Sequence, residues 1–126
     1  MIGRCCALAG RTDSTGNRYG IYSGTVVGRN GDSYEVSIEY NERGIFTNYP
    51  SRGCGNRNAI VPIFPLAQGR LRWTEIIEYD RNSQCVDGGG VTLMQLGVDE
   101  WEYEYVNRRQ FVVGTIRYAC DVPCPF

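Results

Sequence analysis

The chain has 126 residues and a formal net charge of -1, so it presents no overall positive field for general nucleic-acid binding. All thirteen basic residues are arginine and histidine is absent, which excludes imidazole catalysis, histidine metal ligands and lysine Schiff-base chemistry. The 42% hydrophobic content is typical of a globular protein, and no apolar run approaches the roughly 20 residues that span a bilayer. We therefore expect a single domain over residues 1–126 with no membrane span.

A β-hairpin is the clearest element in the first third of the chain. Asn30-Gly31 is typical of a tight type I′ turn, because both residues accept positive backbone angles. The run Ser33–Tyr40 then alternates strictly between polar and apolar residues, which predicts a strand with one buried face. That face carries Tyr34, Val36, Ile38 and Tyr40.

The middle of the chain is less regular. Residues 49–58 read as a loop, and Pro62 and Pro65 keep the apolar run 59–64 out of a central strand position. Over residues 70–79, Leu71, Trp73, Ile77 and Tyr79 alternate as in a strand, although Trp73, Ile76 and Ile77 would also suit a short helix face. We favour the strand because no capping pattern opens a helix. A polar loop with three consecutive glycines follows over residues 80–90.

The last third predicts a three-stranded antiparallel meander over residues 91–96, 101–106 and 111–118. Together with the earlier segments this makes seven to nine short strands. The sequence therefore predicts an all-β fold, a small antiparallel β-sandwich or barrel built from hairpins and a meander.

Six cysteines favour disulfide bonds formed in an oxidising compartment. This indicates an extracellular or virion-associated protein, although no apolar signal peptide follows Met1. A mature secreted chain with an added Met1, a particle component oxidised after release, and a cytosolic protein with reduced or metal-bound thiols all remain open. The disulfide candidates, which fifteen pairings could connect, are Cys5, Cys6, Cys54, Cys85, Cys120 and Cys124.

The segment Glu100–Tyr105 places three carboxylates on one face of a strand and three aromatic rings on the other. We interpret the rings as core and the carboxylates as a solvated face, with Arg117 or the pair Arg70 and Arg72 as ionic partners. The functional alternative is an exposed aromatic platform that stacks on sugars or a protein partner. Its ligand-binding candidates are Trp73, Trp101 and Tyr103. At a separate hairpin tip, Arg108 and Arg109 are either solvated or a pair of guanidinium groups that binds one carboxylate or phosphate.

Metal-binding patterns are weak, and we predict neither a metal nor a cofactor. Cys120 and Cys124 lie near zinc-ligand spacing, and Cys5 and Cys6 could complete a site, but disulfides explain the same residues more simply. The oxygen-rich series Asp80, Asn82, Gln84 and Asp87 resembles part of a calcium loop, but Val91 stands where the closing glutamate belongs.

These features favour a non-catalytic β-domain that acts by binding or by self-assembly outside the cell or on a particle. It would be a structural subunit of a filament, coat or virion, or a module that binds carbohydrate or protein. The alternative is a small carboxylate-dependent hydrolase, such as a glycosidase, in which a cleft holds Glu75, Glu78 or Asp80.

Overall fold

The computed structural model describes residues 10–63, 66–83 and 85–120, and no residue in these ranges is helical. Nine strands form one antiparallel sheet, which confirms the expected all-β fold. The strands are β1 (Gly20–Gly28), β2 (Ser33–Asn41), β3 (Gly44–Tyr49), β4 (Cys54–Gly55), β5 (Arg70–Thr74), β6 (Tyr79–Asp80), β7 (Gly90–Gly97), β8 (Glu100–Val106) and β9 (Phe111–Tyr118).

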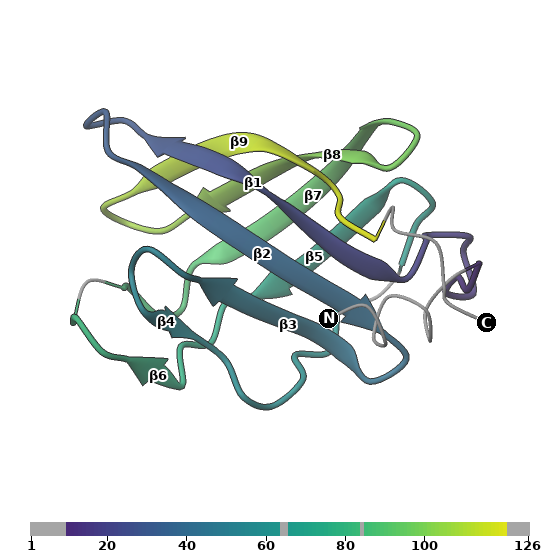
Figure 1. Cartoon of the computed structure of the whole chain (residues 1–126), viewed down its shortest axis with the longest axis horizontal. Coiled ribbons are helices and arrows are strands. Elements are labelled where there is room, and N and C mark those ends of the chain that lie inside the picture. Colours follow the sequence, from purple (N-terminus) through teal and green to yellow (C-terminus); the bar gives the residue numbers. More distant parts are fainter. Residues whose placement is uncertain (1–9, 64–65, 84, 121–126) are drawn as a thin grey trace.

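The sheet is curled into a half-barrel with the strand order β5-β7-β8-β9-β1-β2-β3-β4-β6. In Figure 1 the strands β1, β2 and β3 cross in front of β5, β7 and β8, so the two halves of the sheet face each other. The hydrophobic core fills the space between them and draws buried side chains from both halves. The concave side of the sheet is therefore the interior of the protein.

The two halves join along the antiparallel pairing of β1 with β9, which we call the seam. Glycines allow the two backbones to approach closely there. A Cβ atom on Gly24 would lie 2.1 Å from the carbonyl oxygen of Thr115, and one on Gly114 would lie 2.5 Å from that of Thr25. Such distances are far below van der Waals contact, so side chains at these positions would push the strands apart.

Two local predictions from the sequence were wrong in detail. The β1–β2 connection covers residues 29–32, with Gly28 N–H donating to the carbonyl of Asp32, and only Gly31 of the Asn-Gly pair has a positive φ. It is therefore longer than a two-residue type I′ turn. The strand expected over residues 70–79 ends at Thr74, because the backbone then leaves β7 and Glu78 N–H bonds to Gly55 instead.

The aromatic face of β8 belongs to the core, as the simpler interpretation predicted. Trp101 is 2% exposed, Trp73 on β5 is 0% exposed, and both are wholly enclosed by the two halves of the sheet. Neither can form the exposed platform that the functional alternative required, so that part of the prediction was wrong. On the outer face Arg117 Nε lies 2.9 Å from a Glu100 carboxylate oxygen, which confirms Arg117 as an ionic partner.

The two buried tryptophans differ in hydrogen bonding, which predicts different costs of substitution. The Trp101 ring hydrogen-bonds Tyr22, whereas Trp73 Nε1 has no partner among the described residues. We expect Trp101→Phe to lower the free energy of unfolding by about 1 kcal/mol more than Trp73→Phe, because only the first change removes a hydrogen bond. Urea denaturation of the two variants measures the difference. Equal costs would contradict the argument.

Candidate functional site

A cavity of about 40 Å³ opens from the concave interior toward solvent, between residues of β2, β3 and β8 and the residues that follow β5. Because a water molecule needs roughly 10 to 15 Å³, the cavity has room for a few waters or for the tip of a ligand. Its walls are formed by Tyr34, Tyr49, Arg52, Glu75, Ile77, Cys85, Val86, Tyr103, Tyr105 and Gln110. We call it the tyrosine cavity.

The carboxylate of Glu75 lies in the wall of the tyrosine cavity although the side chain is only 1% exposed. Its position follows from β5, in which Leu71 and Trp73 are buried and alternate residues are exposed. Glu75 lies one residue beyond the strand and continues this alternation, so its side chain is buried like those of Leu71 and Trp73. Its backbone N–H donates to Gly89 and its carbonyl accepts from Gly88, which fixes the side chain toward the interior.

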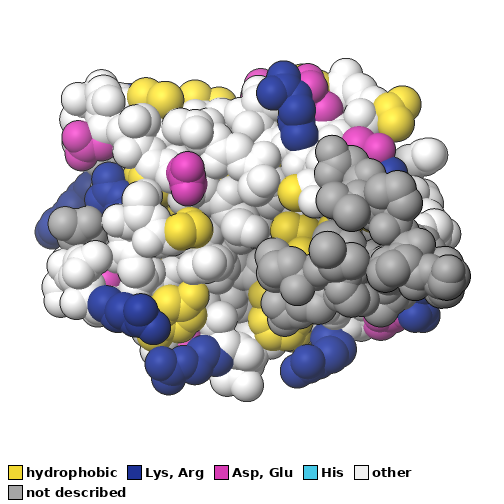
Figure 2. Space-filling model, in the orientation of Figure 1, with side chains coloured by type: hydrophobic (Ala, Val, Ile, Leu, Met, Phe, Trp, Pro, Cys, Tyr) yellow, Lys and Arg dark blue, Asp and Glu magenta, His cyan; other side chains and the backbone are white. Residues whose placement is uncertain are grey.

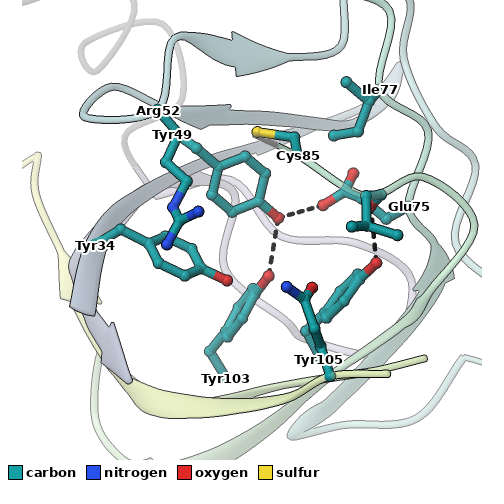
Figure 3. Close-up of a pocket in the computed structure, with 10 residues that line it drawn as sticks. Tyr34, Tyr49, Arg52, Glu75, Ile77, Cys85, Tyr103 and Tyr105 are labelled. Carbon is teal, nitrogen blue, oxygen red and sulfur yellow. Dashed lines mark hydrogen bonds between the residues drawn. The ribbon is translucent and has the colours of Figure 1, made fainter. Parts of the chain in front are cut away.

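Three hydroxyl groups form a hydrogen-bonded chain with this carboxylate. Thr47 Oγ1 donates to Glu75 Oε1 at 2.9 Å, and the Tyr49 hydroxyl donates a short hydrogen bond to Oε2. The hydroxyls of Tyr49 and Tyr103 lie 2.8 Å apart. Figure 3 shows the bonds of Tyr49 with Glu75 and Tyr103, with the Tyr34 hydroxyl directed into the same space. The residues come from β2, β3 and β8 as well as from the end of β5.

Burial sets the ionisation behaviour of this cluster. Desolvation raises the pKa of Glu75 above its ordinary value, although hydrogen bonds from Tyr49 and Thr47 partly oppose the shift. Desolvation also raises the pKa of Tyr49 and Tyr103 well above the ordinary phenol value, and that of Tyr34 to about 12. The tyrosines are therefore neutral hydrogen-bonding groups at physiological pH.

The direction of the hydroxyl chain depends on Glu75. When Glu75 is ionised, Tyr49 gives its single proton to the carboxylate, so the bond between the two phenols must be donated by Tyr103. When Glu75 is protonated it can donate to Tyr49, and Tyr49 can then donate to Tyr103. The Tyr103 hydroxyl can then donate its hydrogen bond to another acceptor. One proton on Glu75 thus changes which hydrogen bonds the cavity offers.

The outer wall of the cavity is a loop held by a disulfide bond. Cys85 is bonded to Cys54 on β4, with the Cα atoms 6.6 Å apart. The neighbouring Val86 carbonyl accepts a hydrogen bond of 2.8 Å from the Tyr105 hydroxyl. Cys120 is also disulfide-bonded, whereas Cys5, Cys6 and Cys124 lie outside the described residues. The disulfide expectation is thus confirmed for the pair Cys54 and Cys85.

The ligand-binding residues predicted from the sequence do not lie together in the structure. Tyr103 lines the tyrosine cavity, Arg109 lines an adjacent cavity, and Arg108 is exposed on the β8–β9 turn. Trp73 and Trp101 line neither cavity. Tyr49 and Arg52 also line the tyrosine cavity but were not predicted from the sequence, since nothing in their local pattern shows that they meet Tyr34 and Tyr103 in the fold.

The three carboxylates proposed for hydrolysis have different surroundings. Glu75 lines the tyrosine cavity, whereas Glu78 is exposed and accepts hydrogen bonds of 2.7 Å from the backbone N–H groups of Arg57 and Asn58. These bonds lower the pKa of Glu78. Asp80 accepts from the backbone N–H of Cys85 at 3.1 Å. Glu78 and Asp80 therefore hold loops together, and Glu75 alone of the three lies in a cavity wall.

Candidate metal ligands are engaged in other interactions. Cys54, Cys85 and Asp80 bring ligand atoms within 4.8 Å of one another, but the two sulfur atoms are bonded together, so this group offers no thiolate. Of the residues that resembled a calcium loop, Asp87 accepts from Ile77 N–H and Asn82 donates to the Arg52 carbonyl. Gln84 lies outside the described residues.

Comparisons with protein-family models, curated proteins and solved structures found no match to this chain. The described residues also contain no helix of the length and apolarity needed to cross a bilayer.

Proposed function

We propose that the protein is a non-catalytic binding domain of an extracellular or particle-associated kind, and that the tyrosine cavity receives a hydroxyl-bearing ring of a carbohydrate ligand. The observation that carries the proposal is the cluster of four tyrosines around one buried carboxylate at a solvent-accessible cavity. Such clusters combine apolar ring faces with fixed hydrogen-bonding groups, the usual composition of a small-molecule site.

The size and chemistry of the cavity favour a sugar over a purely apolar ligand. A volume of about 40 Å³ admits one substituent, such as a hydroxymethyl group, while the rest of a ring lies outside against Tyr34 and Gln110. A sugar hydroxyl both donates and accepts hydrogen bonds, so it can match the Tyr103 hydroxyl in either direction of the chain. Buried polar groups also make the site specific, because a ligand without the matching hydroxyl would leave them without a hydrogen-bond partner.

A binding experiment on two matched variants tests the proposal. A glycan array would identify ligands, and calorimetry would then compare Tyr34→Phe with Tyr19→Phe. Both residues are half-buried tyrosines, but only Tyr34 lines the cavity. We expect Tyr34→Phe to weaken binding about five- to tenfold, the equivalent of one hydrogen bond, with the melting temperature unchanged. Equal affinities in the two variants, or no glycan bound, would overturn the proposal.

A second candidate, a carboxylate-dependent hydrolase, is favoured by the raised pKa of Glu75, since a general acid needs such a shift. Against it, Glu75 is the only carboxylate among the described residues that line the cavity, while paired-carboxylate hydrolysis requires a second one roughly 5 to 10 Å away. Hydrolysis of a bound glycan that is abolished by Glu75→Gln would establish this candidate instead.

The sequence also allows that the protein acts by self-association, as a structural subunit. A native mass spectrum of the unreduced protein reports oligomeric state and disulfide content together. A monomer that binds glycan supports a binding module. Stable higher oligomers without glycan binding would identify a structural subunit.

A further inference from the structure

A second cavity of about 150 Å³ adjoins the tyrosine cavity and shares three of its wall residues, Tyr34, Arg52 and Gln110. Its other walls come from the β1–β2 turn and the beginning of β9. A ligand seated at Tyr34 would therefore contact both cavities. We call the second one the arginine cavity, because Arg29, Arg52 and Arg109 all line it.

The charge of the arginine cavity is opposite to that of the whole chain. Three arginines and one aspartate, Asp32, are the charged residues in its described walls, which leaves an excess of two positive charges. The complete chain carries a net charge of -1. Figure 2 shows basic side chains gathered at the end of the molecule where the β8–β9 turn lies in Figure 1. Three positive charges that line one cavity repel one another, so an anion placed between them would be attracted.

Two of the guanidinium groups are oriented by aromatic rings. The Arg52 guanidinium lies 4.5 Å from the centre of the Tyr34 ring, and that of Arg29 lies 5.3 Å from the centre of the Phe111 ring. Stacking fixes the plane of a guanidinium while its N–H groups remain directed outward from the edge. That arrangement suits the bidentate binding of a carboxylate or phosphate, because less side-chain freedom is lost on binding.

Asp32 does not neutralise the site. It is 3.9 Å from Arg52 at its nearest approach, and its carboxylate also accepts a hydrogen bond of 2.9 Å from the Asn30 side chain. Arg29 and Arg109 have no carboxylate within ion-pair distance among the described residues. Arg29 and Arg109 are thus available to a ligand.

We infer that the arginine cavity binds an anionic group, a carboxylate or a phosphate, and that the ligand of this protein is an acidic saccharide with its anionic group beside Arg29 and Arg109. The identity of the ligand rests on the proposed carbohydrate function, whereas anion binding at this cavity does not. The two claims can therefore be tested separately.

The test uses inorganic phosphate and acetate as probes on the unreduced chain of 126 residues. Each is titrated at constant ionic strength, and nuclear magnetic resonance follows the arginine Nε–H signals and the backbone amides of residues 28–32 and 109–112. We expect saturable shifts confined to the arginine cavity. Tighter binding of acetate would indicate a carboxylate-bearing ligand, and tighter binding of phosphate a phosphorylated one.

Arg109→Gln and Arg108→Gln form a matched pair, because the two residues are adjacent and exposed on one turn but only Arg109 lines the cavity. We expect Arg109→Gln to weaken anion binding at least fivefold and Arg108→Gln to leave it unchanged. Equal effects of the two substitutions, or shifts of similar size at Arg70 and Arg72 on β5, would overturn the inference. Saturable anion binding without any glycan binding would instead overturn the carbohydrate function and leave the anion site standing.

Discussion

Replacement of both Cys54 and Cys85 by alanine is expected to lower the free energy of unfolding by about 3 to 4 kcal/mol. The disulfide closes a loop between positions 31 residues apart, and the chain-entropy relation assigns a cost of this size to losing such a cross-link. Cys54 is also fully buried, so truncation of its side chain adds a small packing loss. Urea denaturation of the oxidised protein and of the double variant measures the change.

The double variant should nevertheless keep its fold, because backbone hydrogen bonds also hold the loop. Glu75 N–H donates to Gly89 at 2.8 Å, and Gly88 N–H donates to Glu75 at 3.0 Å. Ser14→Ala, an exposed substitution outside the strands, is a suitable control and should change stability by less than about 0.5 kcal/mol. A loss below about 1 kcal/mol in the double variant would show that these backbone bonds, and not the disulfide, restrain the loop.

Glu75→Gln is expected to stabilise the protein at neutral pH, and Glu75→Ala to destabilise it by about 2 to 4 kcal/mol. Glutamine keeps the shape of the side chain and an acceptor for Tyr49 but carries no charge that burial would penalise. Alanine removes the carboxylate that accepts from the Thr47 and Tyr49 hydroxyls and opens a void. Both changes remove the carboxylate, so the contrast between them separates its charge from its volume and hydrogen bonds.

The pH dependence has a definite sign. Because the pKa of Glu75 is raised in the folded protein, its favourable contribution is complete below the ordinary pKa of 4.5 and is lost as the pH rises through the folded-state value. The advantage of Glu75→Gln should therefore be present at pH 8 and disappear by pH 4. Urea midpoints of the variant and the unaltered protein at the two pH values provide the measurement.

Glu78 provides a control of opposite sign. Hydrogen bonds from the backbone of Asn58 and Arg57 lower its pKa, so its contribution is present above the ordinary value and lost as the pH falls. Glu78→Gln should thus reduce stability at pH 8, where Glu75→Gln increases it. If both substitutions reduced stability at pH 8, the assignment of a raised pKa to Glu75 would be wrong.

The sequence predicted those parts of the fold that depend on local alternation. The buried face of β2 and the meander of β7, β8 and β9 follow from polar and apolar residues that alternate with the period of a strand. The short strands β4 and β6 were not predicted, because each has only two residues and depends on distant pairing partners. Local pattern contains no information about such partners.

The candidate site was less predictable than the fold for the same reason. The parity of Leu71 and Trp73 indicates that Glu75 points inward, so its burial could have been found from sequence. Its contact with Tyr49 links residues 26 positions apart, and the contact of Tyr49 with Tyr103 spans 54 positions. These contacts arise from the curl of the sheet, which brings β3 against β8, and alternation alone does not predict that curl.

The seam between β1 and β9 has a consequence for folding kinetics. The strands β1, β2 and β3 pair with their neighbours in sequence, as do β7, β8 and β9, so each group can assemble quickly from local contacts. Among the strand pairings of the described residues, the seam alone joins the two groups, and it pairs strands near opposite ends of the described chain. We expect docking along the seam to limit the refolding rate, since it closes the longest loop. We also expect Gly24 and Gly114 to determine how readily the two halves dock, because they allow the close approach of the strands.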